Sequence, residues 1–125
     1  MLKKILLSLV LACVVNAGDL TLSRDNTLIL NGPITRASVS SLIERGREID
    51  SISKSEYPIY LFINSPGGRI GPGLELVDFL SSINRPVHTI TLRSISMGWQ
   101  IVQHLGKRFI LRYGTMMSHK AFGTI

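Results

Sequence analysis

Apolar residues follow two patterns that alternate along most of the chain. Short runs rich in apolar and β-branched residues predict strands at 27–30, 59–63, 87–92 and 109–111, with a further extended piece at 115–119. Apolar residues at helical spacing predict helices at 38–52, 74–83 and 99–105. Strands that alternate with helices are typical of an α/β fold whose parallel strands are joined by right-handed crossovers.

The sharpest predicted change from strand to helix lies at Arg93–Gln100, with Ser96 at its turning point. A serine at the start of a helix places its hydroxyl where backbone N–H groups lack intrahelical partners and the helix dipole favours developing negative charge. This position suits a nucleophile. It also suits an ordinary helix N-cap, because serine is one of the favoured capping residues.

Three loops of the predicted sheet carry residues that could form one site, because ligands and catalytic groups of open α/β sheets gather at the strand ends. The loops contain Pro66-Gly67-Gly68, Ser96-Met97-Gly98 and Ser118-His119. Acyl transfer by serine needs a hydroxyl, a base and two donors aimed at the oxyanion.

In this scheme the backbone N–H groups of Gly68 and Met97 are the candidate oxyanion donors. His119 is the candidate base, because an imidazole titrates near neutrality. Each feature also has a structural interpretation, in which the glycine pair forms a turn and His119 is a packed residue. His88 and His104 are interpreted as structural.

Charge and composition exclude some classes of function. The formal net charge is +6, but the basic residues are scattered and aromatic residues are too few to alternate with them as base-stacking platforms. We therefore predict a solvated basic surface and no nucleic-acid partner. The histidines and carboxylates lack the spacing of metal ligands, and Gly67-Gly68 does not fit a phosphate-binding loop, so we expect no metal and no cofactor.

Residues 1–17 have the pattern of a secretory signal peptide, with Lys3 and Lys4 before an apolar stretch too short to span a bilayer. Cleavage is expected after Ala17, leaving 18–125 as the mature domain in the periplasm or outside the cell. Two alternatives stay open, namely an uncleaved membrane anchor and lipidation of Cys13, the only cysteine.

Taken together, the motifs resemble those of the proteolytic subunit of the Clp protease and its ClpP-like relatives. Ile63–Gly68 is similar to the family's glycine loop, and Ser94–Gly98 is similar to its nucleophile corner. Gly106–Phe109 and Met116–Lys120 follow in the family's order, so the resemblance covers nearly all of 25–125.

The resemblance implies a ClpP/crotonase-like β-β-α spiral and a serine endopeptidase that acts on peptides or unfolded proteins. It implies Ser96 as nucleophile, His119 as base, and the Gly68 and Met97 amides as oxyanion donors. The family's third triad member is an aspartate well downstream of the histidine, whereas this sequence ends at Ile125. We therefore expect an incomplete domain with little activity of its own. In a serine protease, loss of the carboxylate that orients the imidazole lowers kcat by about 10⁴-fold.

The resemblance also bears on partners. The full-length form is expected to be a homo-oligomer. ClpP works with a cytosolic ATP-driven unfoldase, and an exported relative is expected to act without one.

Other functions remain to be weighed. A Ser/Lys peptidase like signal peptide peptidase A or the NfeD-type proteases would take Lys107 or Lys120 as its base. A non-catalytic assembly protein of the same fold is the alternative outside the enzymes. A crotonase-like acyl-CoA enzyme does not call for this serine and histidine pair.

Overall fold

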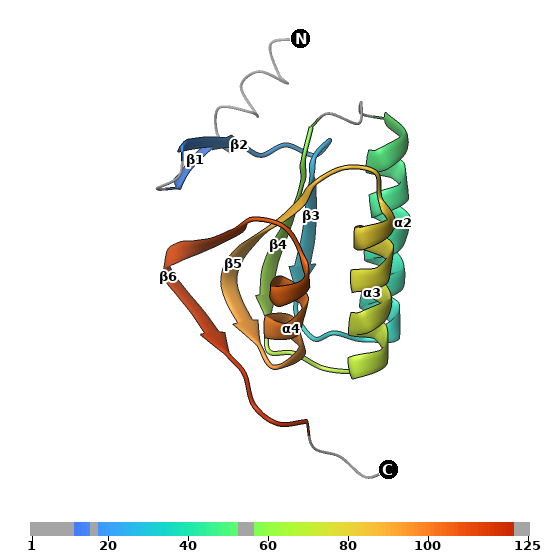
Figure 1. Cartoon of the computed structure of the whole chain (residues 1–125), viewed down its shortest axis with the longest axis vertical. Coiled ribbons are helices and arrows are strands. Elements are labelled where there is room, and N and C mark those ends of the chain that lie inside the picture. Colours follow the sequence, from blue (N-terminus) through green and yellow to red (C-terminus); the bar gives the residue numbers. More distant parts are fainter. Residues whose placement is uncertain (1–11, 16–17, 53–56, 122–125) are drawn as a thin grey trace.

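The computed structural model describes residues 12–15, 18–52 and 57–121, and its centre is a four-stranded sheet. The spatial order is β3-β4-β5-β6, and every neighbouring pair is parallel. In chain order, the strands of this sheet and the helices between them are β3 (Thr27–Asn31), α2 (Arg36–Ile52), β4 (Ile59–Ser65), α3 (Ile70–Ser82), β5 (Val87–Ile95), α4 (Met97–His104) and β6 (Arg108–Met117) (Figure 1). The predicted α/β fold is confirmed, and it agrees with a ClpP-like fold.

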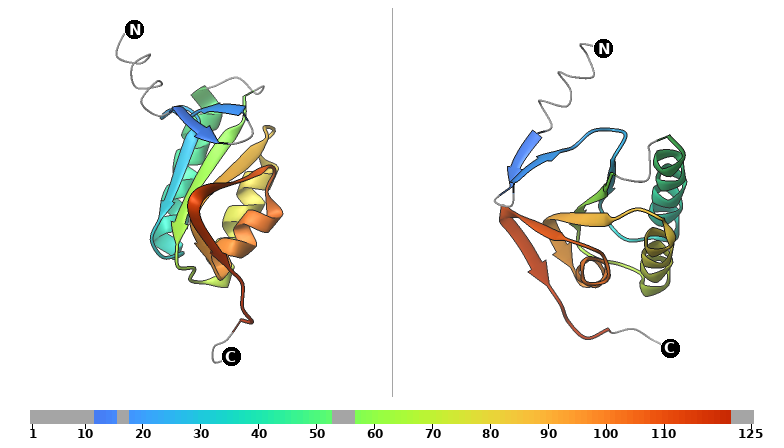
Figure 2. Two further views of the ribbon diagram at one scale, coloured as in Figure 1. Left: turned by 90° about the vertical axis from the view of Figure 1, so that its left-hand side faces the viewer. Right: turned by 45° about the horizontal axis from the view of Figure 1, so that its top comes forward.

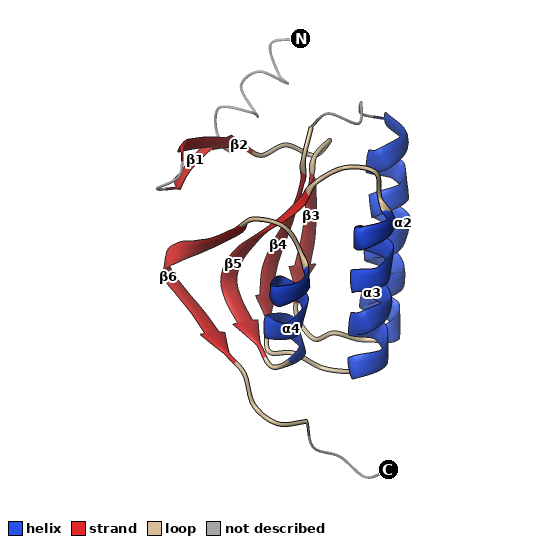
Figure 3. Cartoon of the chain, in the orientation of Figure 1, coloured by secondary structure: helices blue, strands red, loops and turns tan. Residues whose placement is uncertain are grey.

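Helices α2, α3 and α4 cover one face of the sheet. α2 and α3 lie side by side along it, and α4 packs beside β5 (Figures 2 and 3). Leu28 and Leu30 of β3 point into this helix-covered layer and are each 1% exposed, whereas Ile29 between them is 62% exposed. Strand β4 also contributes its inward side chains to this layer, since Leu61 and Ile63 are fully buried. The main core therefore lies between the sheet and the helices.

An apolar row crosses the opposite face of the sheet. It consists of register partners on the four strands, namely Ile29, Phe62, Ile90 and Phe109. Leu20 and Leu22 belong to the cluster on this face, together with Tyr60 and Ile90. This explains why the run 59–63 carries apolar residues at both alternating positions, as strands buried on both faces do.

Two short strands precede the sheet. β1 (Ala12–Val15) and β2 (Gly18–Thr21) pair with each other in antiparallel register. Most of the predicted leader, and Ala17 at its expected cleavage point, lie outside the described residues. Within the described part of the chain, no helix has the length and apolar character needed to cross a membrane.

Several predicted boundaries differ from the structure, and two elements, α3 and β6, differ most. α3 begins at Ile70 rather than at residue 74 and includes Pro72, because the first turn of a helix tolerates a residue without an N–H donor. β6 is one strand over Arg108–Met117 rather than two separate pieces. Its register with β5 shifts between Thr91 and Arg93, which lets the strand bend without breaking (Figure 2).

The carboxyl-terminal ends of all four strands lie on the same side of the molecule, which is the lower side in Figure 1. The glycine loop leaves β4 there, the Ser96 corner leaves β5, and the segment containing His119 leaves β6. Parallel pairing thus gathers three loops that are far apart in the sequence.

Candidate active site

Ser96 joins β5 to α4 through a backbone conformation that L-residues rarely adopt. Its φ is 55° and its ψ is −117°, and it is the only residue besides glycines with a positive φ in the described part of the chain. Such a conformation costs about 1–3 kcal/mol and persists only where the surroundings hold it. The Ser96 N–H donates to Met117 O at 2.7 Å, and Gln100 N–H donates to Ser96 O at 3.2 Å. A serine held this way between a strand and a helix has the geometry of a nucleophile elbow.

The hydroxyl of Ser96 does not cap the helix that follows it. No side-chain cap hydrogen bond forms at this N-cap position, and Ser96 is partly exposed. The structure therefore argues against the N-cap interpretation of this serine. Ser96 is thus partly exposed at the positive end of α4, with its side chain outside the capping pattern.

The glycine loop lies directly against this corner. Gly67 has a φ of 98°, and a Cβ added to it would lie 2.8 Å from the Ser96 Cβ and 2.7 Å from Ile95 O. Any side chain here would therefore overlap with the elbow. Glycine at this position lets two loops that are about thirty residues apart in sequence come into contact.

The direction of the Gly68 N–H is fixed by a hydrogen bond to the carbonyl of the same peptide group, the one that joins Gly67 to Gly68. Ile34 N–H donates to Gly67 O at 2.9 Å, and Arg69 N–H donates to Ile34 O at 2.9 Å. Because the N–H and C=O of a trans peptide point in opposite directions, the Gly68 N–H points away from Ile34. Gly68 is exposed, and a Cβ on it would overlap with the Ile34 backbone. Its N–H is thus available on the open side of the loop.

A second donor lies on the other side of Ser96. Met97 is the first residue of α4, so its N–H has no carbonyl one turn earlier within the helix. Its side chain is 4% exposed and anchors the helix start in the core, where a Cβ on Gly73 would meet its Sδ at 3.1 Å. A buried anchor keeps the direction of this N–H constant.

His119 follows β6 and is exposed. It lies two residues beyond Met117, whose carbonyl accepts the Ser96 N–H, so about 7 Å of extended chain separate the two positions. The His119 Nδ1 is 2.7 Å from Lys120 O. Because a carbonyl only accepts, this contact places the proton on Nδ1 and leaves the Nε2 of a neutral ring as an acceptor.

The structure brings the glycine loop and the serine corner together, but it does not join the imidazole to the hydroxyl. Among the described residues, no hydrogen bond links Ser96 Oγ with His119. Catalytic hydrogen bonds are often long in ligand-free structures and tighten when substrate binds.

The two candidate lysines differ in position. Lys107 precedes β6, ten residues before Met117, and its N–H donates to the Nδ1 of His88 at 3.0 Å. A strand of this length separates its ends by roughly 30 Å. Lys107 is therefore at the wrong end of β6 to act on Ser96. Lys120 is adjacent to His119 and stays a candidate.

Ser65 is a residue at this site that the sequence analysis missed. It ends β4, it is fully buried, and its Oγ accepts a hydrogen bond from Gly67 N–H at 3.1 Å. The available signal was a hydroxyl at an inward position of an otherwise apolar strand. Such a group needs a partner when it is buried.

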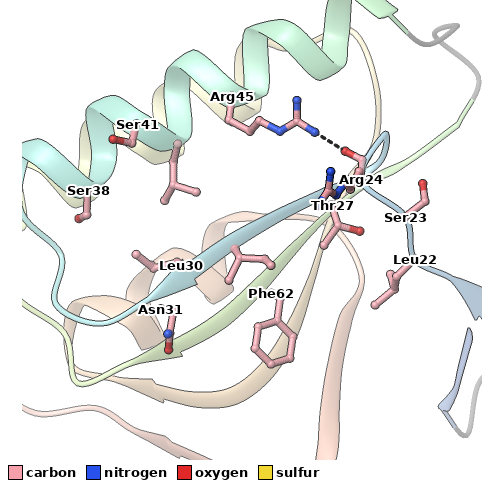
Figure 4. A pocket seen from close by; sticks show the side chains of 12 residues that line it. Leu22, Ser23, Arg24, Thr27, Leu30, Asn31, Ser38, Ser41, Arg45 and Phe62 are labelled. Atoms are coloured by element: carbon pink, nitrogen blue, oxygen red, sulfur yellow. Dashed lines mark hydrogen bonds between the residues drawn. The ribbon is translucent and has the colours of Figure 1, made fainter. Parts of the chain in front are cut away.

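A cavity of about 940 Å³ lies elsewhere, between β3 and α2. Apolar and polar side chains both line it, and the apolar ones are Leu22, Ile29, Leu30, Leu42 and Phe62 (Figure 4). At one end Arg45 reaches from α2 and donates to Arg24 O at 2.6 Å. None of the cavity's lining residues belongs to the serine corner, the glycine loop or β6.

Comparison with known proteins identifies the family. The family model described as Clp protease matches residues 17–125. The chain is 34% identical over 105 residues to the ATP-dependent Clp protease proteolytic subunit of Streptococcus pneumoniae (strain 70585), covering 82% of this chain and 53% of that protein. The protein of the same name from Streptococcus salivarius is 33% identical over the same coverage.

The chain belongs to the Clp protease family. The resemblance drawn from the glycine loop and the serine corner is confirmed, and membership supports peptidase activity as the family's chemistry. The chain spans about half the length of the curated Clp protease subunits that it matches.

Proposed function

We propose that this protein is a serine endopeptidase that cleaves peptide bonds through an acyl-enzyme. In this mechanism Ser96 Oγ attacks the substrate carbonyl while His119 Nε2 takes the hydroxyl proton. The resulting oxyanion receives hydrogen bonds from the Gly68 and Met97 N–H groups. Collapse of the tetrahedral intermediate breaks the C–N bond, and the leaving amine takes the proton from His119. Water then releases the acyl group by the reverse sequence of proton transfers.

The observation that carries the proposal is the strained backbone of Ser96 packed against Gly67. A serine with only a structural role would not need a positive φ, and this serine does not cap its helix. The two candidate amides come from different loops, and the close approach of Gly67 to the Ser96 Cβ brings these loops together. This arrangement supports acyl transfer better than it supports a non-catalytic assembly protein.

Peptides or unfolded proteins are the proposed substrates, and a homo-oligomer of the longer form is the proposed assembly. Export is proposed from residues 1–17, with no ATP-driven partner at the final location. Cell fractionation with the mass of the mature chain tests this. A mature chain that begins at Gly18 supports export, and full-length protein in the cytosol in complex with an ATPase contradicts it.

A fluorophosphonate probe tests the nucleophile, because it reacts with activated serines. Labelling at Ser96 is expected even at the low activity predicted for a chain without the family's aspartate, and Ser96→Ala should lose it completely. The matched control is Ser51→Ala, since Ser51 is an exposed serine at the end of α2 whose hydroxyl bonds Glu48 O. Labelling that is absent from the wild-type chain, or that persists in Ser96→Ala, contradicts the proposal.

A pair of variants tests the base. His119→Ala is expected to lower the labelling rate by at least 10²-fold, in line with the usual contribution of a general base. Lys120→Ala is expected to leave the rate within about twofold. The reverse result would assign the protein to the Ser/Lys peptidases.

A further inference from the structure

The side chain that ends β4 is a buried hydroxyl that the proposed mechanism does not use. Ser65 is 0% exposed, at a position where the preceding inward residues Leu61 and Ile63 are apolar. Burying a hydroxyl without a partner is unfavourable, so its hydrogen bond has to be accounted for. The partner is the N–H of Gly67, two residues along the glycine loop, at 3.1 Å.

This bond holds one of the two peptide groups around Gly67. The Ser65 hydroxyl accepts from the N–H of the Pro66–Gly67 peptide, while Ile34 N–H donates to the carbonyl of the Gly67–Gly68 peptide at 2.9 Å. Glycine has more freedom about φ and ψ than other residues, so a glycine pair keeps one conformation only when outside groups hold it. Ser65 and Ile34 are the two outside groups.

The peptide held by Ser65 is adjacent to the one that carries the proposed oxyanion donor. A rotation at Gly67 would change the direction of the Gly68 N–H. Such a rotation would weaken stabilisation of the oxyanion, because donors stabilise an oxyanion only when their orientation is fixed toward it. The Ser65 hydroxyl thus acts on the site without reaching the substrate, since it is fully buried behind the loop.

The position of Ser65 in the sheet makes it a stable support. It is in register with Ser94 on β5, and a Cβ on Gly98 at the start of α4 would lie 3.7 Å from the Ser65 Cβ. The hydroxyl is therefore packed between the sheet and the first turn of α4. The same packing sets the distance between the glycine loop and the elbow.

We propose that Ser65 is a positioning residue of the oxyanion site, whose hydroxyl fixes the glycine loop so that the Gly68 N–H faces the reacting carbonyl. This inference rests on the proposed function. It goes beyond it by assigning to a buried hydroxyl the orientation of one donor.

The test compares Ser65→Ala with Thr91→Val by the saturation kinetics of fluorophosphonate labelling at Ser96. Thr91 is a suitable control because it is also fully buried, and within the described part of the chain its Oγ1 pairs with Ser94 Oγ at 3.0 Å rather than with the glycine loop. Each variant loses one buried hydroxyl and one side-chain hydrogen bond. Only Ser65→Ala releases the Gly67 N–H.

The expected result is a fall of about 10- to 10²-fold in the limiting labelling rate of Ser65→Ala, with unchanged half-saturation by the probe. This is smaller than the 10²- to 10³-fold typical of removing an oxyanion donor, because the donor stays present but is misaligned. Thr91→Val should stay within about twofold of the wild type. A limiting rate of Ser65→Ala equal to that of Thr91→Val overturns the inference, as does a change confined to half-saturation.

If circular dichroism shows that Ser65→Ala does not fold, Ser65→Cys takes its place, because a thiol is a weaker acceptor of the same shape. A reduced limiting rate at unchanged half-saturation supports the inference, and a wild-type rate overturns it. Failure of the proposed function is recognised separately. In that case the wild-type chain itself is not labelled at Ser96.

Discussion

The N–H of Ser96 donates a hydrogen bond to the carbonyl of Met117 at 2.7 Å. This bond ties the end of β5 to the end of β6, because Ile95 and Met117 are register partners. It also ties the proposed nucleophile to the segment that carries the proposed base, since His119 lies two residues further on. The geometry of the site therefore depends on the register of one parallel strand pair.

The strain at Ser96 predicts a separation of stability from function. Ser96→Gly should be more stable than Ser96→Ala by roughly 1 kcal/mol, because glycine adopts a positive φ freely while alanine keeps the strain of about 1–3 kcal/mol, and glycine loses part of the gain to backbone entropy. Urea unfolding of both variants measures the difference. Equal stability would mean that φ 55° at this position carries no strain.

Gly67 is predicted to tolerate no side chain. Gly67→Ala should lower the free energy of unfolding by about 1–3 kcal/mol and abolish Ser96 labelling, because its Cβ would overlap with Ile95 O and the Ser96 Cβ. The matched control is Gly71→Ala in α3, where an added Cβ meets nothing within 4 Å. That change should raise stability by up to about 1 kcal/mol, since alanine favours helices. Urea unfolding measures the change in stability of the two variants, and fluorophosphonate labelling measures the reactivity of Ser96 in each.

Much of the fold could be predicted from the sequence because its signals are local. The run at 59–63 is apolar at both alternating positions, the run at 87–92 is rich in apolar and β-branched residues, and the glycine and proline residues around them mark the loops. Each predicted strand and helix of the sheet is present in the structure. The start of α3 was placed four residues late because Pro72 reads as a breaker, although a helix accepts it in the first turn.

The site could be predicted only in part, because its contacts join loops distant in sequence. Ser96 and Gly67 could be suspected from residue type, but only the parallel register places them in contact. The hydrogen bond of Ser65 has no sequence motif of its own. The strain at Ser96 was also unpredictable, since serine is common at helix starts for a different reason.

Acid is predicted to destabilise the protein through His88. Burial lowers the pKa of His88 below its ordinary value, the nearby charge of Lys107 lowers it further, and a backbone hydrogen bond opposes these effects. The neutral ring accepts the Lys107 N–H at Nδ1 and stacks edge-on with Tyr60 and Phe109. Because the folded pKa lies below the unfolded value of about 6.5, the unfolded chain binds the proton more readily. The stabilising contribution is therefore complete above about pH 6.5 and is lost as the pH falls through the folded pKa.

His88→Gln removes this titration and keeps a polar side chain at the position. Between pH 7.5 and pH 5, the wild-type chain should lose more unfolding free energy than His88→Gln does. The other ionisable groups are the same in both proteins, so their contributions cancel in the difference. An equal acid dependence in the two proteins would show that His88 is not the responsible group.

Two threonines of β5 should respond in opposite ways to the same substitution. Thr89 and Thr91 are both fully buried, but Thr89 Oγ1 has no hydrogen-bond partner among the described residues, whereas Thr91 Oγ1 pairs with Ser94 Oγ. Thr89→Val should raise the free energy of unfolding by about 1 kcal/mol, because it removes an unsatisfied hydroxyl and keeps the shape of the side chain. Thr91→Val should lower it by about 1–3 kcal/mol, because the Ser94 hydroxyl is left buried without its partner. Urea melts of the two variants measure both changes, and a loss of stability in Thr89→Val would mean that its hydroxyl has a partner in solution.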